Sequence, residues 1–155
     1  MRRRDREVTK VEDQLSILND CKVCRIAVQD AQGLYIVPLN FGYSYEQGHL
    51  TLYFHSAASG RKISAIEKNG AIAFEMDCRH RLIVAETACG YGYAFGSIIG
   101  NGTASIVWDT QEKQRALSLL MKHQTGREFV FDSRSADAVT VLKMEVTAFS
   151  VKERR

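Results

Sequence analysis

Residues 23–55 read VCRIAVQDAQGLYIVPLNFGYSYEQGHLTLYFH. Three segments in this stretch are rich in β-branched and aromatic residues, which favour strands. We expect these strands at 23–29, 34–43 and 50–55, with turns at 30–33 and 46–48. Because short turns join antiparallel neighbours, the stretch predicts a three-stranded antiparallel meander.

The rest of the chain adds strands in consecutive runs and a few short helices. Further strands are expected at 72–77, 93–107 and 140–146, with an uncertain strand piece at 82–84. Helices are expected at 10–19, 60–69 and 110–124, the first and last beginning with capping boxes at Thr9 and Asp109. Strands that are not regularly alternated with helices favour a mainly β fold, an α+β domain or closed β-barrel, over a doubly wound parallel sheet.

Composition and charge exclude several classes of protein. With 155 residues, 45% apolar and 25% charged, the chain fits one globular domain spanning 1–155 and not a disordered chain. No run of about 18 apolar residues exists, so we expect no membrane span. The charged start does not resemble a secretory signal, and four cysteines without such a signal indicate the cytoplasm. The net charge of +3 comes from the two ends, so the near-neutral body predicts no nucleic-acid partner.

Pro38, the only proline, interrupts an otherwise regular strand pattern. Proline has no N–H, so we expect an edge or a bulge there, with nearby backbone groups free to bind something else. Apolar residues alternate on both faces of this strand, Leu34, Ile36 and Pro38 on one and Tyr35, Val37, Leu39 and Phe41 on the other. Such a strand predicts a subunit interface or a flat ligand over its second face, unless it is simply central to the core.

His55 ends the third strand on its polar side, just before a loop and a helix. Ser56, Ser59, Arg61 and Lys62 follow at or just before the helix N-terminus. Hydroxyls, free amides, the helix dipole and two cations together suit a phosphate. The alternative is a histidine at the surface and a basic first turn that arose by chance.

The cysteines suggest two other kinds of site. Cys21-Lys22-Val23-Cys24 has the spacing of a zinc ligand pair, but it runs into a strand where Cys24 is expected in the core, so no metal site is predicted. Cys89 lies in a glycine-rich loop, where a redox role is open. The sequence contains no dinucleotide-binding loop, P-loop or nucleophile elbow.

At these residues the chain resembles the pyridoxamine 5′-phosphate oxidase-like family of flavin-binding split barrels, and more closely its nitroimidazole-resistance branch. The similarity extends over nearly the whole chain. The matching segments are Met1-Arg2-Arg3-Arg4-Asp5-Arg6, residues 21–26, 35–43, 52–57, 60–62, 74–77, and Ser97-Ile98-Ile99-Gly100 with Gly102.

The resemblance implies a six-stranded antiparallel split barrel that forms a homodimer with FMN at the subunit interface. It further implies that Val37, Pro38, Leu39, Asn40 and Phe41 line the isoalloxazine ring. His55, Ser56, Arg61 and Lys62 would hold the phosphate end or border the substrate pocket, and Ser97 and Ile98 would approach from the other side. His55 would also be the catalytic residue, as a substrate contact or proton donor.

The function implied is FMN-dependent two-electron reduction of a small nitro compound or related acceptor. Because the chain lacks the arginine-rich C-terminal signature of true pyridoxamine phosphate oxidases, oxidation of the vitamin B6 phosphate is not expected. The alternative is a non-catalytic dimer that binds FMN, FAD, haem or a deazaflavin, since family members vary in this way.

Overall fold

The computed structural model describes residues 3–155; Met1 and Arg2, which begin the basic N-terminal segment, lie outside this range. Six antiparallel strands close into a barrel in the order β1-β2-β3-β6-β5-β4. The strands are β1 (Val23–Asp30), β2 (Gly33–Glu46), β3 (His49–Ser56), β4 (Ala71–Ile83), β5 (Gly92–Val107) and β6 (Thr140–Arg154). The predicted antiparallel barrel is therefore confirmed, including the meander of its first three strands.

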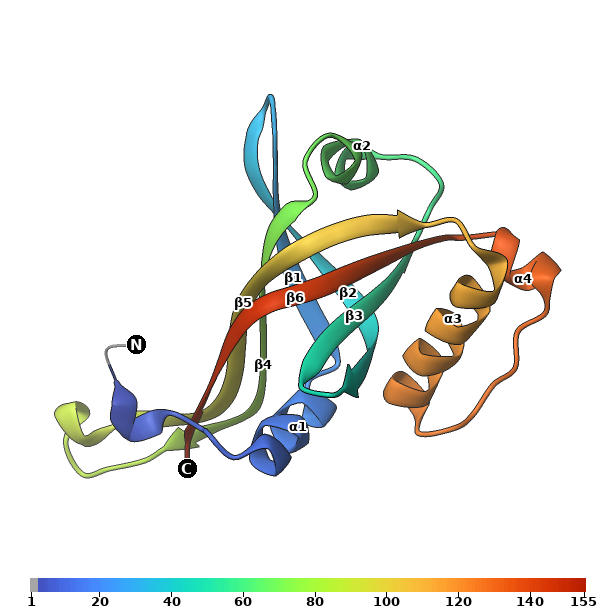
Figure 1. Ribbon diagram of the computed structural model, residues 1–155. Helices are drawn as coiled ribbons and strands as arrows, with labels where there is room; N and C mark the ends of the chain where they lie inside the picture. The colour runs from blue at the N-terminus through green and yellow to red at the C-terminus, as the bar shows by residue number, and fades with distance from the viewer. Residues whose placement is uncertain (1–2) are drawn as a thin grey trace.

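Short helices surround the barrel (Figure 1). They are α1 (Val11–Asp20), α2 (Arg61–Lys68), α3 (Thr110–Thr125) and α4 (Ser133–Asp137), with 3₁₀ turns η1 (Arg4–Arg6) and η2 (Ala88–Gly90). The Asp109 carboxylate accepts a hydrogen bond from the Glu112 amide at 2.8 Å, as the capping box predicts. The predicted cap at Thr9 is wrong, because α1 begins after Lys10 without a side-chain cap.

Apolar side chains that alternate along the strands fill the barrel. Leu50, Leu52 and Phe54 all point into this core, as the alternation in β3 predicts. Tyr53 points outward and is nevertheless buried, because α3 and α4 cover it. The outward face of β3 is therefore divided between a helix-covered part and its exposed end at His55.

Two strands are longer than the sequence predicts. β4 continues to Ile83 through a bulge between Cys78 and Arg81, where Arg79 has a positive φ of 59°. Arg79 is fixed there by Asp20 at 2.7 Å and Glu153 at 2.8 Å. β6 continues to Arg154, paired with β5, and carries Val151 into the core. The hairpin between β4 and β5 consequently extends away from the barrel (Figure 1).

No helix in residues 3–155 combines the length and hydropathy needed to cross a membrane. The strand piece predicted at 82–84 lies in the extended hairpin between β4 and β5, where β4 runs as far as Ile83.

Candidate functional site

β2 changes strand partner in the middle of its length. Residues 33–40 pair with β1, whereas residues 41–46 pair with β3. The side of residues 33–40 that faces away from β1 therefore has no strand partner. Pro38 lies within this open edge, so the predicted edge position is confirmed. Because hydrogen-bonding groups alternate in direction along an antiparallel strand, part of this edge presents free backbone groups.

The open edge begins where β3 ends. Phe41 is the first residue of β2 opposite β3, paired with Phe54, and β3 stops two residues later at Ser56. The chain then leaves the sheet and enters α2 at Arg61. The unpaired edge of β2, the end of β3 and the start of α2 are thus neighbours, and we call the region that they border the slot.

The hydroxyl of Ser56 has no hydrogen-bond partner although Ser56 is only 7% exposed. An unpaired buried hydroxyl is unfavourable by about 1–3 kcal/mol. The first turn of α2 adds further unpaired donors, since its cap position is Gly60 and no side chain caps it. These donors at the end of β3 fit an anionic group, which would satisfy them together.

Two cations occupy the first turn of α2, and they differ in whether a carboxylate is bound to them. Arg61 is bound to Asp30 by two hydrogen bonds, at 2.7 and 2.8 Å, and its guanidinium lies 3.9 Å from the centre of the Tyr35 ring. Lys62 is half-buried and has no ion-pair partner within residues 3–155. Lys62 is therefore the cation that remains available for an anion.

Tyr35, which lies under the Arg61 guanidinium and packs against the core, was not singled out as a site residue from the sequence. Its hydroxyl is buried without a hydrogen-bond partner, like that of Ser56. Burial raises the pKa of Tyr35, so the phenol stays protonated and can donate. The alternation of apolar residues assigned Tyr35 to an apolar face and gave no signal of this polar role.

The residues predicted to line a flavin ring divide into three groups. Val37 and Leu39 are partly buried against the core, and Pro38 is exposed. Asn40 is exposed and donates to the Lys22 carbonyl and to the Gln124 side chain of α3, both at 3.1 Å. Phe41 is fully buried, with its ring 4.6 Å from that of His123, and its carbonyl accepts a hydrogen bond from Gln124 at 2.9 Å, so neither its side chain nor its carbonyl is available to a ligand.

The structure separates the remaining predicted residues. His55 is exposed at the end of β3, next to Ser56. Ser97 lies on β5 and faces outward, in a cleft that also contains Glu75, Asp77 and His80. Ile98 is 1% exposed inside the barrel, so the structure does not place its side chain where a ligand outside could touch it.

The cysteines lie apart from the slot. Cys21, Cys24 and Cys78 are buried, and burial raises the pKa of each thiol. Cys24 is a core residue, as predicted. Residues 3–155 contain no cluster of three or more metal-ligating side chains. Cys89 is exposed in the hairpin between β4 and β5.

A six-stranded antiparallel barrel in which β2 changes partner and leaves one edge unpaired defines the class of small split-barrel proteins. The chain belongs to the pyridoxamine 5′-phosphate oxidase family, whose model matches residues 10–153. No protein with a curated function matches the chain significantly.

Solved structures resemble it over nearly its whole length. A candidate 5-nitroimidazole antibiotic resistance protein from Bacteroides thetaiotaomicron is 28% identical, with a TM-score of 0.80 over 95% of this chain and 86% of that one. The flavocytochrome Anf3 from Azotobacter vinelandii is 19% identical, with a TM-score of 0.78 over 100% and 72%. An FAD-binding protein from Mesorhizobium loti is 20% identical, with a TM-score of 0.63 over 95% and 96%.

Proposed function

We propose that the protein is an FMN-dependent oxidoreductase that reduces a small nitro compound or related acceptor, with the flavin held between two copies of the chain. The single observation that carries the proposal is the buried, unpartnered hydroxyl of Ser56 beside the uncapped N-terminus of α2. Family membership and the similarity to a candidate 5-nitroimidazole resistance protein support the choice of cofactor and substrate class.

The phosphate end of the flavin is assigned to the corner of the slot. Ser56 donates its hydroxyl, the first amides of α2 donate along the helix axis, and Lys62 supplies the charge. Arg61 joins them where the phosphate displaces Asp30 from the guanidinium. Ser56, the first amides of α2 and Lys62 would each gain a partner that they lack, and Arg61 would exchange one partner for another. Binding would therefore remove the unfavourable burial of an unpaired Ser56 hydroxyl.

The ring system is assigned to the open edge of β2. Free backbone groups of residues 33–40 hydrogen-bond its polar edge, and the exposed Pro38 packs against it. The flavin supplies the two-electron chemistry when it is bound. His55, exposed at the border of the slot, holds a proton for the acceptor and is the proposed catalytic residue.

The experiment begins with the visible spectrum of the purified protein and the mass of any extracted chromophore. We expect FMN, or uptake of added FMN at micromolar concentration, and oxidation of NADH or NADPH with a nitro compound. A protein that takes up no flavin refutes the proposal. Extraction of FAD, haem or a deazaflavin would replace the cofactor, and bound FMN without turnover would leave a binding dimer. The FAD-binding relative makes FAD the second cofactor to test.

A serine variant tests the corner itself. Ser56→Ala should weaken FMN binding about tenfold in a fluorescence titration, because one hydrogen bond to a charged group is lost. The same change should not destabilise the flavin-free protein, since it removes a buried hydroxyl without a partner. Ser105→Ala, at an exposed position on β5, is the matched control and should change neither property.

A further inference from the structure

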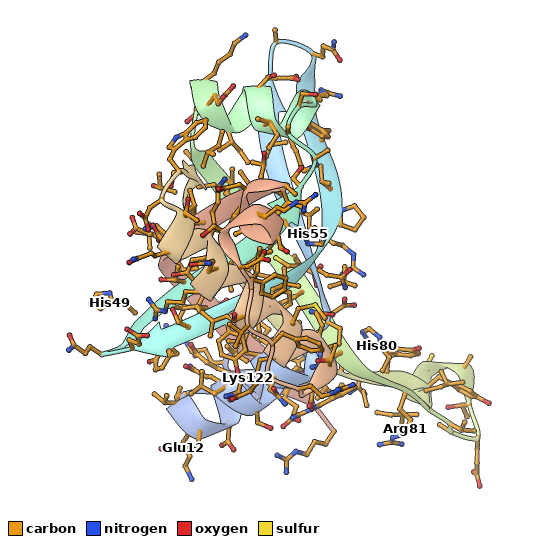
Figure 2. All side chains as sticks on the ribbon, turned by 90° about the vertical axis from the view of Figure 1, so that its right-hand side faces the viewer. Glu12, His49, His55, His80, Arg81 and Lys122 are labelled. Atoms are coloured by element: carbon orange, nitrogen blue, oxygen red, sulfur yellow. The ribbon has the colours of Figure 1, made fainter. Side chains whose placement is uncertain are left out.

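A cavity of about 380 Å³ lies where the hairpin between β4 and β5 meets the end of β6. Its lining consists of Arg79, Arg81, Ala94, Glu153, Arg154 and Arg155, and we call it the arginine cavity. Strand pairing brings these residues together, since Arg81 lies opposite Ala94 and Arg154 lies opposite Phe95. Figure 2 shows Arg81 and His80 on opposite sides of the hairpin, so this cavity is separate from the cleft that contains His80.

Two of the four arginines share the carboxylate of the arginine cavity. Arg79 and Arg155 bind different oxygens of Glu153, at 2.8 and 2.9 Å. Arg79 also lies 2.7 Å from Asp20 and donates to the Ser16 hydroxyl at 2.7 Å, so each of its three guanidinium nitrogens has a partner. Arg79 is therefore a fixed wall of the cavity, and both oxygens of Glu153 are already engaged.

The other two arginines are not neutralised. Among residues 3–155, neither Arg81 nor Arg154 has an ion-pair partner or a side-chain hydrogen bond. Arg81 is exposed, and Arg154 is half-buried with its guanidinium against the Gly92 backbone, where a Cβ would contact it. Because arginine keeps its charge at every ordinary pH, the cavity contains two positive charges that no carboxylate of the described chain balances.

The two ends of the chain add positive charge beside the arginine cavity. The Val8 amide donates to the Val151 carbonyl at 3.0 Å, and Glu7 forms a β-bridge with Lys152. These contacts hold η1, with the exposed Arg4, against the end of β6 (Figure 1). Basic segments from opposite ends of the sequence therefore meet at one end of the barrel, where their combined field attracts anions.

We propose that the arginine cavity binds the phosphate or diphosphate group of a small organic molecule. Guanidinium groups bind phosphate oxygens through pairs of parallel hydrogen bonds, and Arg81 and Arg154 are both available for this. A monocarboxylate carries a single charge and would leave one of these arginines unbalanced. The cavity is larger than a phosphate group, so an organic part fits beside Ala94. A concave site favours a small ligand over nucleic acid, which needs an extended basic face.

The arginine cavity lies far from the slot within one chain. Ser56 pairs with Thr140 at the start of β6, whereas Arg154 is the last residue of that strand. The length of β6 therefore separates the two regions. The inference goes beyond the proposed function and does not depend on the flavin site.

Calorimetric titration with inorganic pyrophosphate tests the arginine cavity. All variants are made in a Lys62→Glu background, so that the anion site proposed in the slot does not contribute. We expect this parent to bind pyrophosphate at about 150 mM NaCl, where exposed charges are largely screened. Arg81→Gln with Arg154→Gln should lower the affinity at least about tenfold, because two donors to a charged group are lost. Arg127→Gln with Arg134→Gln is the control, since it removes the same charge from two exposed arginines elsewhere.

Thermal unfolding shows whether the lost binding is specific. Arg81 and Arg154 hold no partner, so replacing both should not lower the melting temperature of the ligand-free protein. Pyrophosphate should raise the melting temperature of the parent and of the control pair, but not that of the cavity pair.

Four results would overturn the proposal. One is a parent that does not bind pyrophosphate at about 150 mM NaCl. Another is an affinity that the cavity pair leaves unchanged. Equal losses in the cavity pair and the control pair would mean that net charge decides binding. A short single-stranded oligonucleotide that binds more tightly than pyrophosphate, and is lost in the cavity pair, would replace the small ligand by nucleic acid.

Discussion

The carboxylate of Asp30, at the end of β1, binds the guanidinium of Arg61, the first residue of α2, through two hydrogen bonds of 2.7 and 2.8 Å. Arg61 lowers the pKa of Asp30 to about 2, so the carboxylate is charged at every pH at which the protein is expected to work. The chain thus neutralises one of its two cations at the corner where we propose a phosphate binds. Any anion that recruits Arg61 has to compete with Asp30.

Removing this competitor should tighten flavin binding. We expect Asp30→Ala to lower the dissociation constant of FMN by up to about fivefold, because an exposed ion pair contributes at most about 1 kcal/mol. The measurement is a fluorescence titration of the flavin-free protein. Asp13→Ala removes the same charge from an exposed position on α1 and should leave the constant within twofold. An unchanged constant in Asp30→Ala would show that Arg61 stays out of the phosphate site.

Reversing the charge of Lys62 should weaken flavin binding. Lys62→Glu places a negative charge beside the proposed phosphate, and we expect FMN affinity to fall at least tenfold, about 1.4 kcal/mol. Lys68→Glu makes the same charge change at the other end of α2 and serves as the control. Equal losses in the two variants would mean that net charge, and not the corner, decides binding.

His55 should affect turnover and not flavin binding. Its side chain is exposed and makes no hydrogen bond within residues 3–155, so His55→Ala removes no contact that holds the slot. We expect the rate of nitro-compound reduction to fall about a hundredfold, in the range for loss of a general acid. His49→Ala, at the start of the same strand, is the control and should keep full activity. Loss of flavin from His55→Ala would reassign His55 as a cofactor ligand.

His123 should make the fold sensitive to acid. Its Nε2 donates to the Cys21 carbonyl at 2.8 Å, and burial lowers its pKa to about 4. An unfolded histidine titrates near 6.5, so between these values the unfolded state binds a proton that the native state does not. The free energy of unfolding should therefore fall as the pH drops from about 6.5 to about 4, by about 2–3 kcal/mol from this residue.

Urea unfolding across that pH window measures this effect. In His123→Phe the aromatic packing against Phe41 is retained and the titrating group is gone. The variant should lose overall stability with the hydrogen bond, but its stability should depend less steeply on pH. A slope equal to that of the native protein would contradict the assignment.

Gly42 should tolerate no side chain. A Cβ added there would fall on the backbone N and Cα of Leu120 in α3, which cannot rotate away as a side chain can. We expect Gly42→Ala to destabilise the protein by about 2–3 kcal/mol in thermal or urea unfolding, because α3 has to move off the barrel. Ser44→Ala, two residues along β2, is the control. A loss below about 0.5 kcal/mol would mean that α3 packs less closely than described.

Local patterns predicted most of the fold. The turns at 30–33 and 46–48 and the alternation in β3 fixed the meander, because turn chemistry and side-chain direction depend on neighbouring residues. Pro38 marked the open edge of β2 for the same reason, since a missing N–H is a local property. The extensions of β4 and β6 were missed, because polar residues and a bulge obscure their periodicity.

Local sequence patterns predicted the candidate site only in part. The polar cluster from His55 to Lys62 is consecutive in sequence and could be identified from its chemistry. The unpaired state of the Ser56 and Tyr35 hydroxyls is a result of burial, which depends on what packs around them. Conversely, the resemblance suggested Ile98 as a site residue, but the side chain of Ile98 is buried inside the barrel.

By itself, the sequence determined which segments become strands, where they turn and which of their side chains face the core, because these properties arise between residues close along the chain. Only the tertiary structure decided that Asp30 binds Arg61 and that α3 lies against Gly42. Those contacts join residues 31 and 78 positions apart, and their existence depends on how the barrel closes. Local sequence patterns do not encode how segments that are distant along the chain pack against each other.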